Sequence, residues 1–77
     1  MTKIPIVDAR KMERVLNHLG FIATRQRGSH VFYRHGDGRT TTLPHHPGRD
    51  LARPLIRTIL REIDLSPDEF EKALREI

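Results

Sequence analysis

The stretch from residue 21 to residue 44 constrains the fold most, because two glycine turns divide it into three runs of strand-forming residues. β-Branched and aromatic residues recur in the runs 21–27, 31–35 and 40–43. Gly28 and Ser29 mark the first turn, and a Gly-Asp-Gly string marks the second. Short turns join antiparallel neighbours. The pattern therefore predicts a three-stranded antiparallel meander, which a proline ends at position 44.

Three helices are expected beside this meander. Residues 8–19 combine the capping residue Asp8 with one apolar stripe, and a glycine follows directly. Pro54 begins a second apolar stripe after a loop, and Ser66 opens a capping box for a third helix. The order α-β-β-β-α-α predicts the α+β class, with a three-stranded antiparallel sheet packed on helices on one face. No linker divides the chain, so residues 1–77 are expected to form a single domain.

The face of the sheet that His30 occupies is an open question at this point. If His30 points away from the helices, period-two alternation sends Phe32 and Arg34 outward with it. A histidine, an aromatic ring and an arginine on one uncovered face would suit RNA. The opposite phase buries Phe32 and removes that argument. A one-residue bulge near Gly28 is able to set either phase.

The charge is divided along the chain. Residues 21–61 carry eight arginines and no lysine against two acidic side chains, whereas residues 62–77 carry six acidic side chains against two basic ones. An arginine-rich middle suits a polyanion such as nucleic acid, because guanidinium groups match phosphate geometry. A solvated basic surface without a ligand shows the same pattern. The chain has no cysteine, and its start lacks an apolar run of signal-peptide length, so we expect a cytoplasmic protein.

Several motifs occur in a fixed order and at fixed spacings, and together they resemble the HicA family of toxin–antitoxin mRNA interferases. They are Gly20-Phe21, the Arg-x-x-Gly-Ser-His string from Arg25 to His30, Asp37-Gly38, Leu43-Pro44 with His46, and the helix "LIRTIL". The resemblance extends from the first helix to about Phe70. It implies a small double-stranded-RNA-binding-like (dsRBD-like) fold and an endoribonuclease that cuts mRNA without a metal or other cofactor and arrests growth. It also implies a HicB-like antitoxin partner that covers the active site.

The resemblance places the catalytic histidine of the family on His30 and the histidine of its Pro-x-His element on His46. RNA can be cut by its own 2′-hydroxyl, which requires a base, an acid and positive charge near the phosphate. Histidine serves as base or acid near neutral pH. No second acid–base group is evident, although His46 would serve if its loop folded back. The expected RNA contacts are Arg25, Arg27, Gly28, Ser29, Arg34 and His46.

Two departures from the family pattern concern loop shape and antitoxin fit rather than chemistry. The second helix is entered through Arg53-Pro54-Leu55 instead of a Gly-Thr pair, and the chain continues past Phe70 by part of a third helix. Arg57 and Arg61 are expected to lie on the solvated face of the second helix. His45 is expected to cap that helix or to hydrogen-bond the loop.

Other functions remain alternatives. A small RNA-binding module that never cuts fits the same residues, and an interaction protein that docks an acidic partner fits the charge. A metal site is disfavoured, because the imidazoles of His30, His35, His45 and His46 show no ligand spacing. A serine hydrolase is disfavoured, because Ser29 and His30 are neighbours on opposite faces of a strand.

Overall fold

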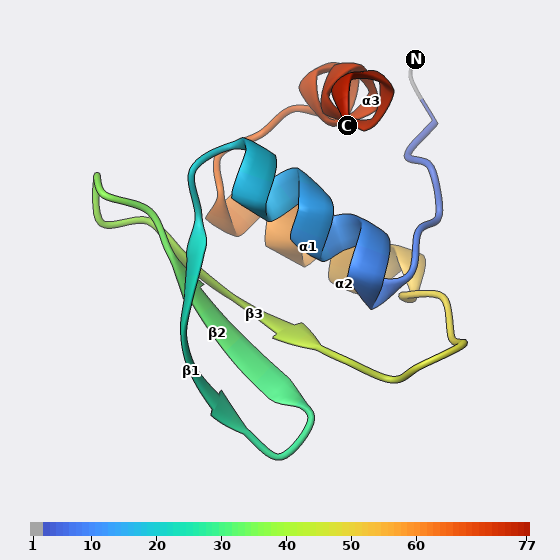
Figure 1. Ribbon diagram of the computed structural model, residues 1–77. Coiled ribbons are helices and arrows are strands. Elements are labelled where there is room, and N and C mark those ends of the chain that lie inside the picture. The colour runs from blue at the N-terminus through green and yellow to red at the C-terminus, as the bar shows by residue number, and fades with distance from the viewer. Residues whose placement is uncertain (1–2) are drawn as a thin grey trace.

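The computed structural model describes residues 3–77, and the sequence order of its elements matches the prediction. The elements are α1 (Ala9–His18), β1 (Ile22–Arg27), β2 (His30–Arg34), β3 (Thr40–Pro44), α2 (Arg53–Glu62) and α3 (Pro67–Glu76). The helices lie on one side of the sheet, and α3 stacks on α1 away from the strands (Figure 1). The α+β prediction is therefore confirmed. None of the helices in residues 3–77 has the length and apolar character needed to cross a membrane.

The helix boundaries follow from the predicted caps. Oδ1 of Asp8 accepts a hydrogen bond of 2.8 Å from the backbone N–H of Lys11, which pairs an amide that the first turn of α1 leaves free. Gly20 follows α1 with φ of 95°, a conformation that a residue with a Cβ adopts only at a cost. Ser66 and Glu69 form a reciprocal capping box at the start of α3. Gly20 thus turns the chain from α1 into β1, and Ser66 begins α3 a few residues after α2 ends.

The three strands form an antiparallel meander in the order β1-β2-β3. The central strand β2 alternates: His30 and Arg34 are exposed, Val31 and Tyr33 are buried, and Phe32 is half-buried on the outer face. The outward phase of His30 is thus confirmed. The register of β1 against β2 shifts between Ala23 and Arg25, and the pairing beside Gly28 is regular.

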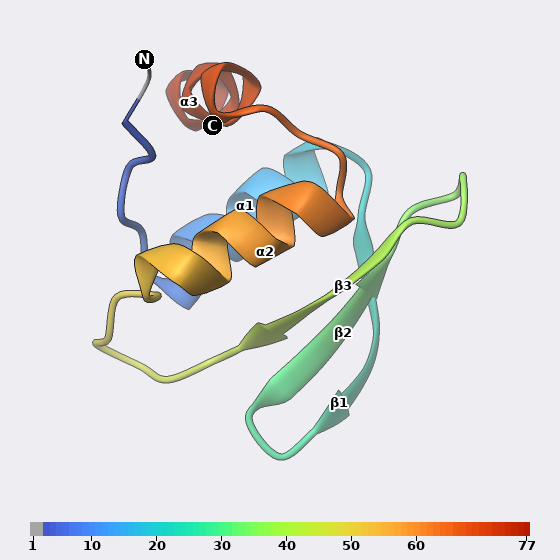
Figure 2. The ribbon, with the colours of Figure 1, turned by 180° about the vertical axis from the view of Figure 1, so that it is seen from behind.

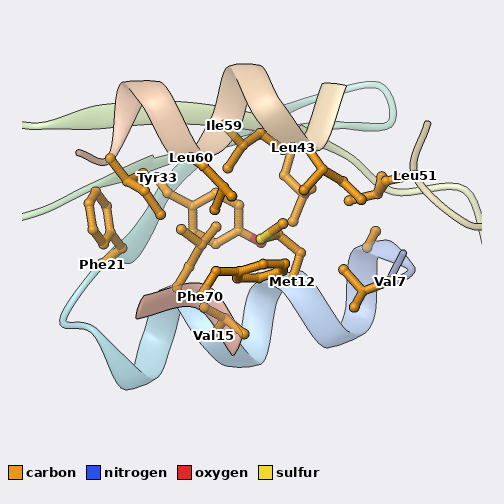
Figure 3. Close-up of a cluster of buried hydrophobic side chains, with 14 of the residues drawn as sticks. Val7, Met12, Val15, Phe21, Tyr33, Leu43, Leu51, Ile59, Leu60 and Phe70 are labelled. Atoms are coloured by element: carbon orange, nitrogen blue, oxygen red, sulfur yellow. The ribbon is translucent and has the colours of Figure 1, made fainter. Parts of the chain in front are cut away.

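Apolar side chains from every layer meet between the sheet and the helices (Figure 3). Tyr33 and Leu43 point inward from the sheet, Met12 comes from α1, Ile59 from α2 and Phe70 from α3, and each is at most 1% exposed. A ring fully buried at the end of the chain shows that α3 belongs to the core. The acidic side chains of Asp68, Glu69 and Glu76 in that helix are exposed.

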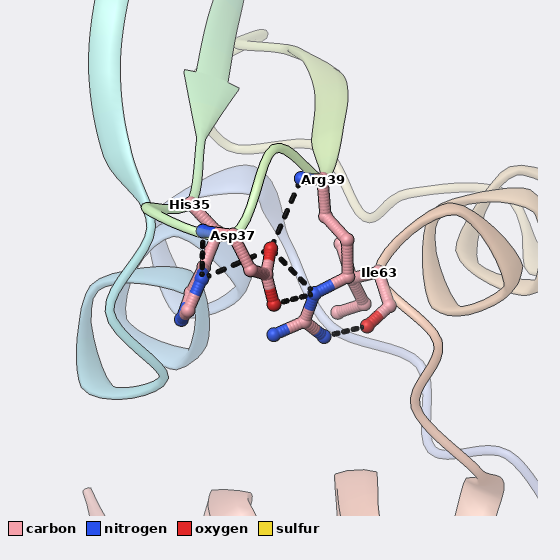
Figure 4. Close-up of polar contacts among 4 residues, drawn as sticks. All are labelled: His35, Asp37, Arg39 and Ile63. Atoms are coloured by element: carbon pink, nitrogen blue, oxygen red, sulfur yellow. Dashed lines mark hydrogen bonds and ion pairs between the residues drawn. The ribbon is translucent and has the colours of Figure 1, made fainter.

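The second turn is tied to the end of α2 (Figure 4). The Asp37 carboxylate accepts hydrogen bonds from the backbone N–H and the guanidinium of Arg39, at 3.0 and 2.8 Å. These contacts, led by the backbone N–H, hold the pKa of the Asp37 carboxyl below its usual range. The guanidinium of Arg39 also donates to the carbonyl of Ile63 and lies 5.1 Å from the ring centroid of Phe21. One arginine therefore fixes the β2–β3 hairpin against α2 and the start of β1.

Replacement of Phe70 by alanine tests whether α3 is part of the folding unit. We expect Phe70→Ala to lower the free energy of unfolding by about 3–5 kcal/mol, because it removes a fully buried ring. That loss is comparable with the whole stability of a domain this small. Urea unfolding followed by circular dichroism measures it, with the exposed Lys72→Ala as control. Equal unfolding curves for the two variants would show that α3 is dispensable.

Candidate functional site

The sheet face away from the helices carries four of the predicted site residues, Arg25, Arg27, His30 and Arg34, in three cross-strand rows. Residues opposite one another on neighbouring strands share a face. The rows are Arg27–His30–Pro44, Arg25–Phe32–Thr42 and Ile22–Arg34–Thr40. Figure 2 shows the helices packed against the other side of the same sheet, so that this face stays uncovered. The rows thus place an imidazole, an aromatic ring and three guanidinium groups on one face of the sheet.

The turn before β2 holds the backbone of His30 in place. Gly28 takes φ of 59°, which a glycine adopts without strain. The side-chain amide of Gln26 donates to the carbonyl of Gly28 at 3.0 Å, and the backbone N–H of His45 donates to the carbonyl of Ser29 at 2.7 Å. The imidazole of His30 is exposed and makes no hydrogen bond or ion pair within residues 3–77. A fixed backbone with an unengaged ring leaves that ring available to a ligand.

Two arginines of β1 flank His30 closely. Arg27 lies directly opposite His30, where paired Cβ atoms are about 5 Å apart. The guanidinium of Arg25 lies 4.6 Å from the ring centroid of Phe32 in the adjoining row. This cation–π contact aligns a planar cation with an aromatic ring. Next to the imidazole there is therefore one arginine free to hold an anion and one stacking surface for a flat group.

Arg34 lies at the other end of the same face. Arg34 lies four residue-to-residue steps along the strand from His30, a distance of about 13 Å. Beside it, Ile22 is 66% exposed, and both residues line a hollow of about 390 Å³ at the start of β1. Arg34 is thus too far along the strand to share one phosphate with His30.

His46 lies in the loop after β3, where it lines a hollow of about 370 Å³ with His45, Glu13 and Asp8 of the α1 side. No contact within residues 3–77 joins it to His30. Nor do any three of the histidine, aspartate and glutamate side chains in that range lie close enough together to hold a metal ion. The open face therefore presents His30 as its only identified acid–base group.

Sequence reasoning missed a hydrogen-bonded chain on the inner side of the sheet. The hydroxyl of Tyr33 lies 2.5 Å from Oε2 of Glu13 and 2.9 Å from Nε2 of His45. The carboxylate accepts the single O–H proton, so the imidazole donates Nε2–H to the tyrosine oxygen. His45 does not cap α2, whose N-cap residue Ala52 offers no side-chain acceptor. A buried tyrosine predicts some partner for its hydroxyl, but the sequence does not name it.

The same contacts keep Tyr33 neutral. Burial, first, and then the hydrogen bond and charge of Glu13 raise the pKa of the Tyr33 hydroxyl well above its usual value. Tyr33 is nearly inaccessible to solvent, so it is a structural link between α1 and the end of β3 and does not reach the open face.

These features define a small, basic α+β domain with an uncovered sheet face that is rich in arginine and carries one free histidine. Comparison with models of protein families matches residues 9–65 to the HicA toxin of bacterial toxin–antitoxin systems. The chain belongs to this toxin family, whose members are known as mRNA interferases. A search of curated proteins gave no match. The resemblance inferred from the sequence motifs is thus confirmed.

Ionisation of Tyr33 provides a direct test of the buried chain. It is the only tyrosine, and the protein has no tryptophan, so tyrosinate absorbance reports on this one group. The unfolded chain ionises near pH 10. The folded pKa is higher, so the folded state retains the proton more tightly, and this stabilisation is present below about pH 10 and lost above it.

We expect tyrosinate absorbance of the folded protein to rise at a higher pH than in denaturant. Thermal unfolding of the wild type should lose stability above about pH 10 more steeply than that of Tyr33→Phe, which lacks the group. Coinciding absorbance curves in the native and denatured states would contradict the contact between Tyr33 and Glu13.

Proposed function

We propose that the chain is a metal-independent endoribonuclease that cuts mRNA, with His30 as its general acid–base group. Family membership supports the substrate class. The observation that carries the proposal is the row of Arg27 and His30 beside the Arg25–Phe32 stack, all on one uncovered face. The titratable group is able to transfer a proton, the cations stabilise charge on the phosphate, and the aromatic ring is able to stack a base of single-stranded RNA.

In the proposed reaction the 2′-hydroxyl of the RNA attacks the adjacent phosphorus. A bond forms between the 2′-oxygen and phosphorus, and the bond from phosphorus to the 5′-oxygen breaks. The products are a 2′,3′-cyclic phosphate and a 5′-hydroxyl end. His30 takes the 2′-proton or supplies a proton to the leaving oxygen, and water accepts or supplies the other proton. The role of His30 is worth about 10²- to 10⁴-fold in rate. Arg27 stabilises the charge that grows on the phosphate.

The remaining predicted residues are proposed to hold the RNA. Phe32 with Arg25 stacks a base, Arg34 holds the strand farther along, and Gly28 and Ser29 allow the backbone of the RNA to approach the turn. His46 is proposed to contact the RNA from its loop. It is not assigned to proton transfer, because no contact within residues 3–77 joins it to His30.

Membership of this toxin family implies a cognate antitoxin. We propose a HicB-like protein with an acidic surface that covers His30 on the open face. The three arginines Arg25, Arg27 and Arg34 make no ion pair within residues 3–77, so an acidic partner gains favourable contacts there and associates faster through steering.

A second candidate function is RNA binding without cleavage. It is favoured by one specific observation: no acid–base partner contacts His30 within residues 3–77. Both candidates require salt-sensitive binding of RNA to the open face. They differ only in whether the bound strand is cut.

Replacement of His30 separates the two candidates. We expect wild-type protein to cut single-stranded mRNA in the presence of EDTA, and His30→Ala to bind the RNA but to cut about 10²- to 10⁴-fold more slowly. Gel analysis of the products and a filter-binding assay measure the two properties. His18→Ala, which changes an exposed imidazole at the end of α1, serves as control. If neither protein cuts while both bind, the chain is a binding module.

Phe32→Ala tests the stacking surface. We expect RNA affinity to fall about 5- to 150-fold, because one base–aromatic stack is worth about 1–3 kcal/mol. Thr42→Ala removes a side chain from the same row and should leave affinity nearly unchanged. Fluorescence anisotropy with a labelled oligoribonucleotide measures both. Equal affinities for wild type and Phe32→Ala would show that RNA binds elsewhere.

A further inference from the structure

The helical side of the molecule contains a groove that the proposed chemistry does not use. It encloses about 770 Å³ between the N-terminal segment, α2 and the start of α3. Four of its lining residues are cationic and four are apolar. They are Lys3, Arg53, Arg57 and Arg61, and Ile4, Leu60, Leu65 and Pro67. No acidic residue lines it, although this half of the chain contains most of the acidic side chains.

The arginines of the groove lie close together, and no acidic side chain lines the groove to neutralise their charges. Arg53, Arg57 and Arg61 are spaced by four residues along α2 and so lie on one face of the helix. Like charges at this spacing destabilise a helix. Within residues 3–77, neither Arg57 nor Arg61 makes an ion pair, whereas Arg75 of α3 pairs with Glu71. The guanidinium of Arg53 donates to the carbonyl of Ile4, which joins the N-terminal segment to the start of α2.

The floor of the groove distinguishes between two kinds of anionic ligand. A nucleic acid strand bound through its phosphates prefers polar and aromatic surfaces. Here the cations surround leucine, isoleucine and proline side chains, which bury apolar groups of a ligand. The row from Arg53 to Arg61 is about 12 Å long, which matches two turns of a helix or about four extended residues. These dimensions and this chemistry fit a short peptide segment with both acidic and apolar side chains.

We propose that this groove is a second docking site, distinct from the open sheet face, for an acidic and apolar segment of the antitoxin. The identification of the partner rests on the proposed function, but the chemistry of the segment follows from the groove alone. The partner then holds the toxin at two places: it covers His30 on the sheet, and it anchors a short segment between α2 and the N-terminal segment. The second contact raises the overall affinity without occupying the RNA-binding face.

A charge-reversal experiment with a matched control tests the proposal. The test protein is Arg57→Glu/Arg61→Glu, and the control is Arg10→Glu/Arg14→Glu, which reverses two exposed arginines at the same spacing on α1. Each is purified as the full chain, and its folding is checked by circular dichroism. Binding to the HicB-like antitoxin of the proposed function is measured by calorimetry. Arg57→Gln/Arg61→Gln removes the charges more gently if the glutamate variant fails to fold.

We expect the groove variant to bind the antitoxin at least about tenfold more weakly and the control to change much less, because only the groove charges contact the acidic segment. RNA cutting by the free groove variant should equal that of the wild type. In the wild type, added antitoxin should shift the methyl resonances of Leu60 and Leu65, which lie in the floor.

Four results would overturn the proposal. Equal losses of antitoxin affinity in the two variants would indicate a general effect of charge. Unchanged affinity of the groove variant would show that the antitoxin does not bind in the groove. Weaker binding of RNA by the free groove variant would make the groove an RNA contact. Absence of any complex with the wild type would remove the partner. RNA cutting by wild type and His30→Ala is measured separately, so failure of the groove proposal is distinguishable from failure of the proposed function.

Discussion

The hydrogen bond between Tyr33 and Glu13 is the constraint on which the orientation of the site depends. Successive residues of a strand face opposite sides of the sheet, so a slip of one residue in β2 would expose Tyr33 and bury His30. Such a slip would also remove a buried hydroxyl from its carboxylate and from His45, which is costly. Because His45 also bonds to the carbonyl of Ser29, the same cluster holds the turn that precedes His30. The exposed histidine is thus fixed by contacts on the opposite face.

The open face itself contributes little to the stability of the fold. Its arginines make no ion pairs within residues 3–77, and its side chains are ordered by few contacts, such as that between Arg25 and Phe32. Stability comes from the buried layer between sheet and helices, where Phe70 and Met12 are fully enclosed. There is a physical reason why the buried layer supplies stability and the open face does not. Unpaired cations repel one another weakly in water, so a small core tolerates them, and they remain available to an anion.

The sequence allowed much of the fold to be predicted, because local signals coincide with element boundaries. Glycine turns, Asp8 and Ser66 mark where strands and helices begin and end. The sequence left the phase of β2 open, because a bulge near Gly28 would have reversed it. The register shift lies instead in β1, between Ala23 and Arg25, where no glycine or proline marks it. The pairing of Arg27 with His30 could be predicted, because a tight turn joins the two strands directly between them.

Other parts of the site depend on contacts between distant segments. The distance between Arg34 and His30 could be calculated only once both were known to lie in one strand. The link of Tyr33 to Glu13 and His45 joins three elements, and no local pattern indicates it. The stacking of Arg25 on Phe32 depends on the bulge, since the shifted register is what brings these two residues opposite one another.

The two faces differ in which parts of the chain build them. Every residue of the open sheet face lies within residues 9–65, the region that matches the toxin family. The groove, in contrast, takes Lys3, Ile4 and Pro67 from outside that region. Substitutions in the N-terminal segment or at the start of α3 therefore reshape the groove and leave the rows around His30 intact. If the groove docks the antitoxin as proposed, substitutions there change the choice of protein partner without changing the proposed RNA chemistry.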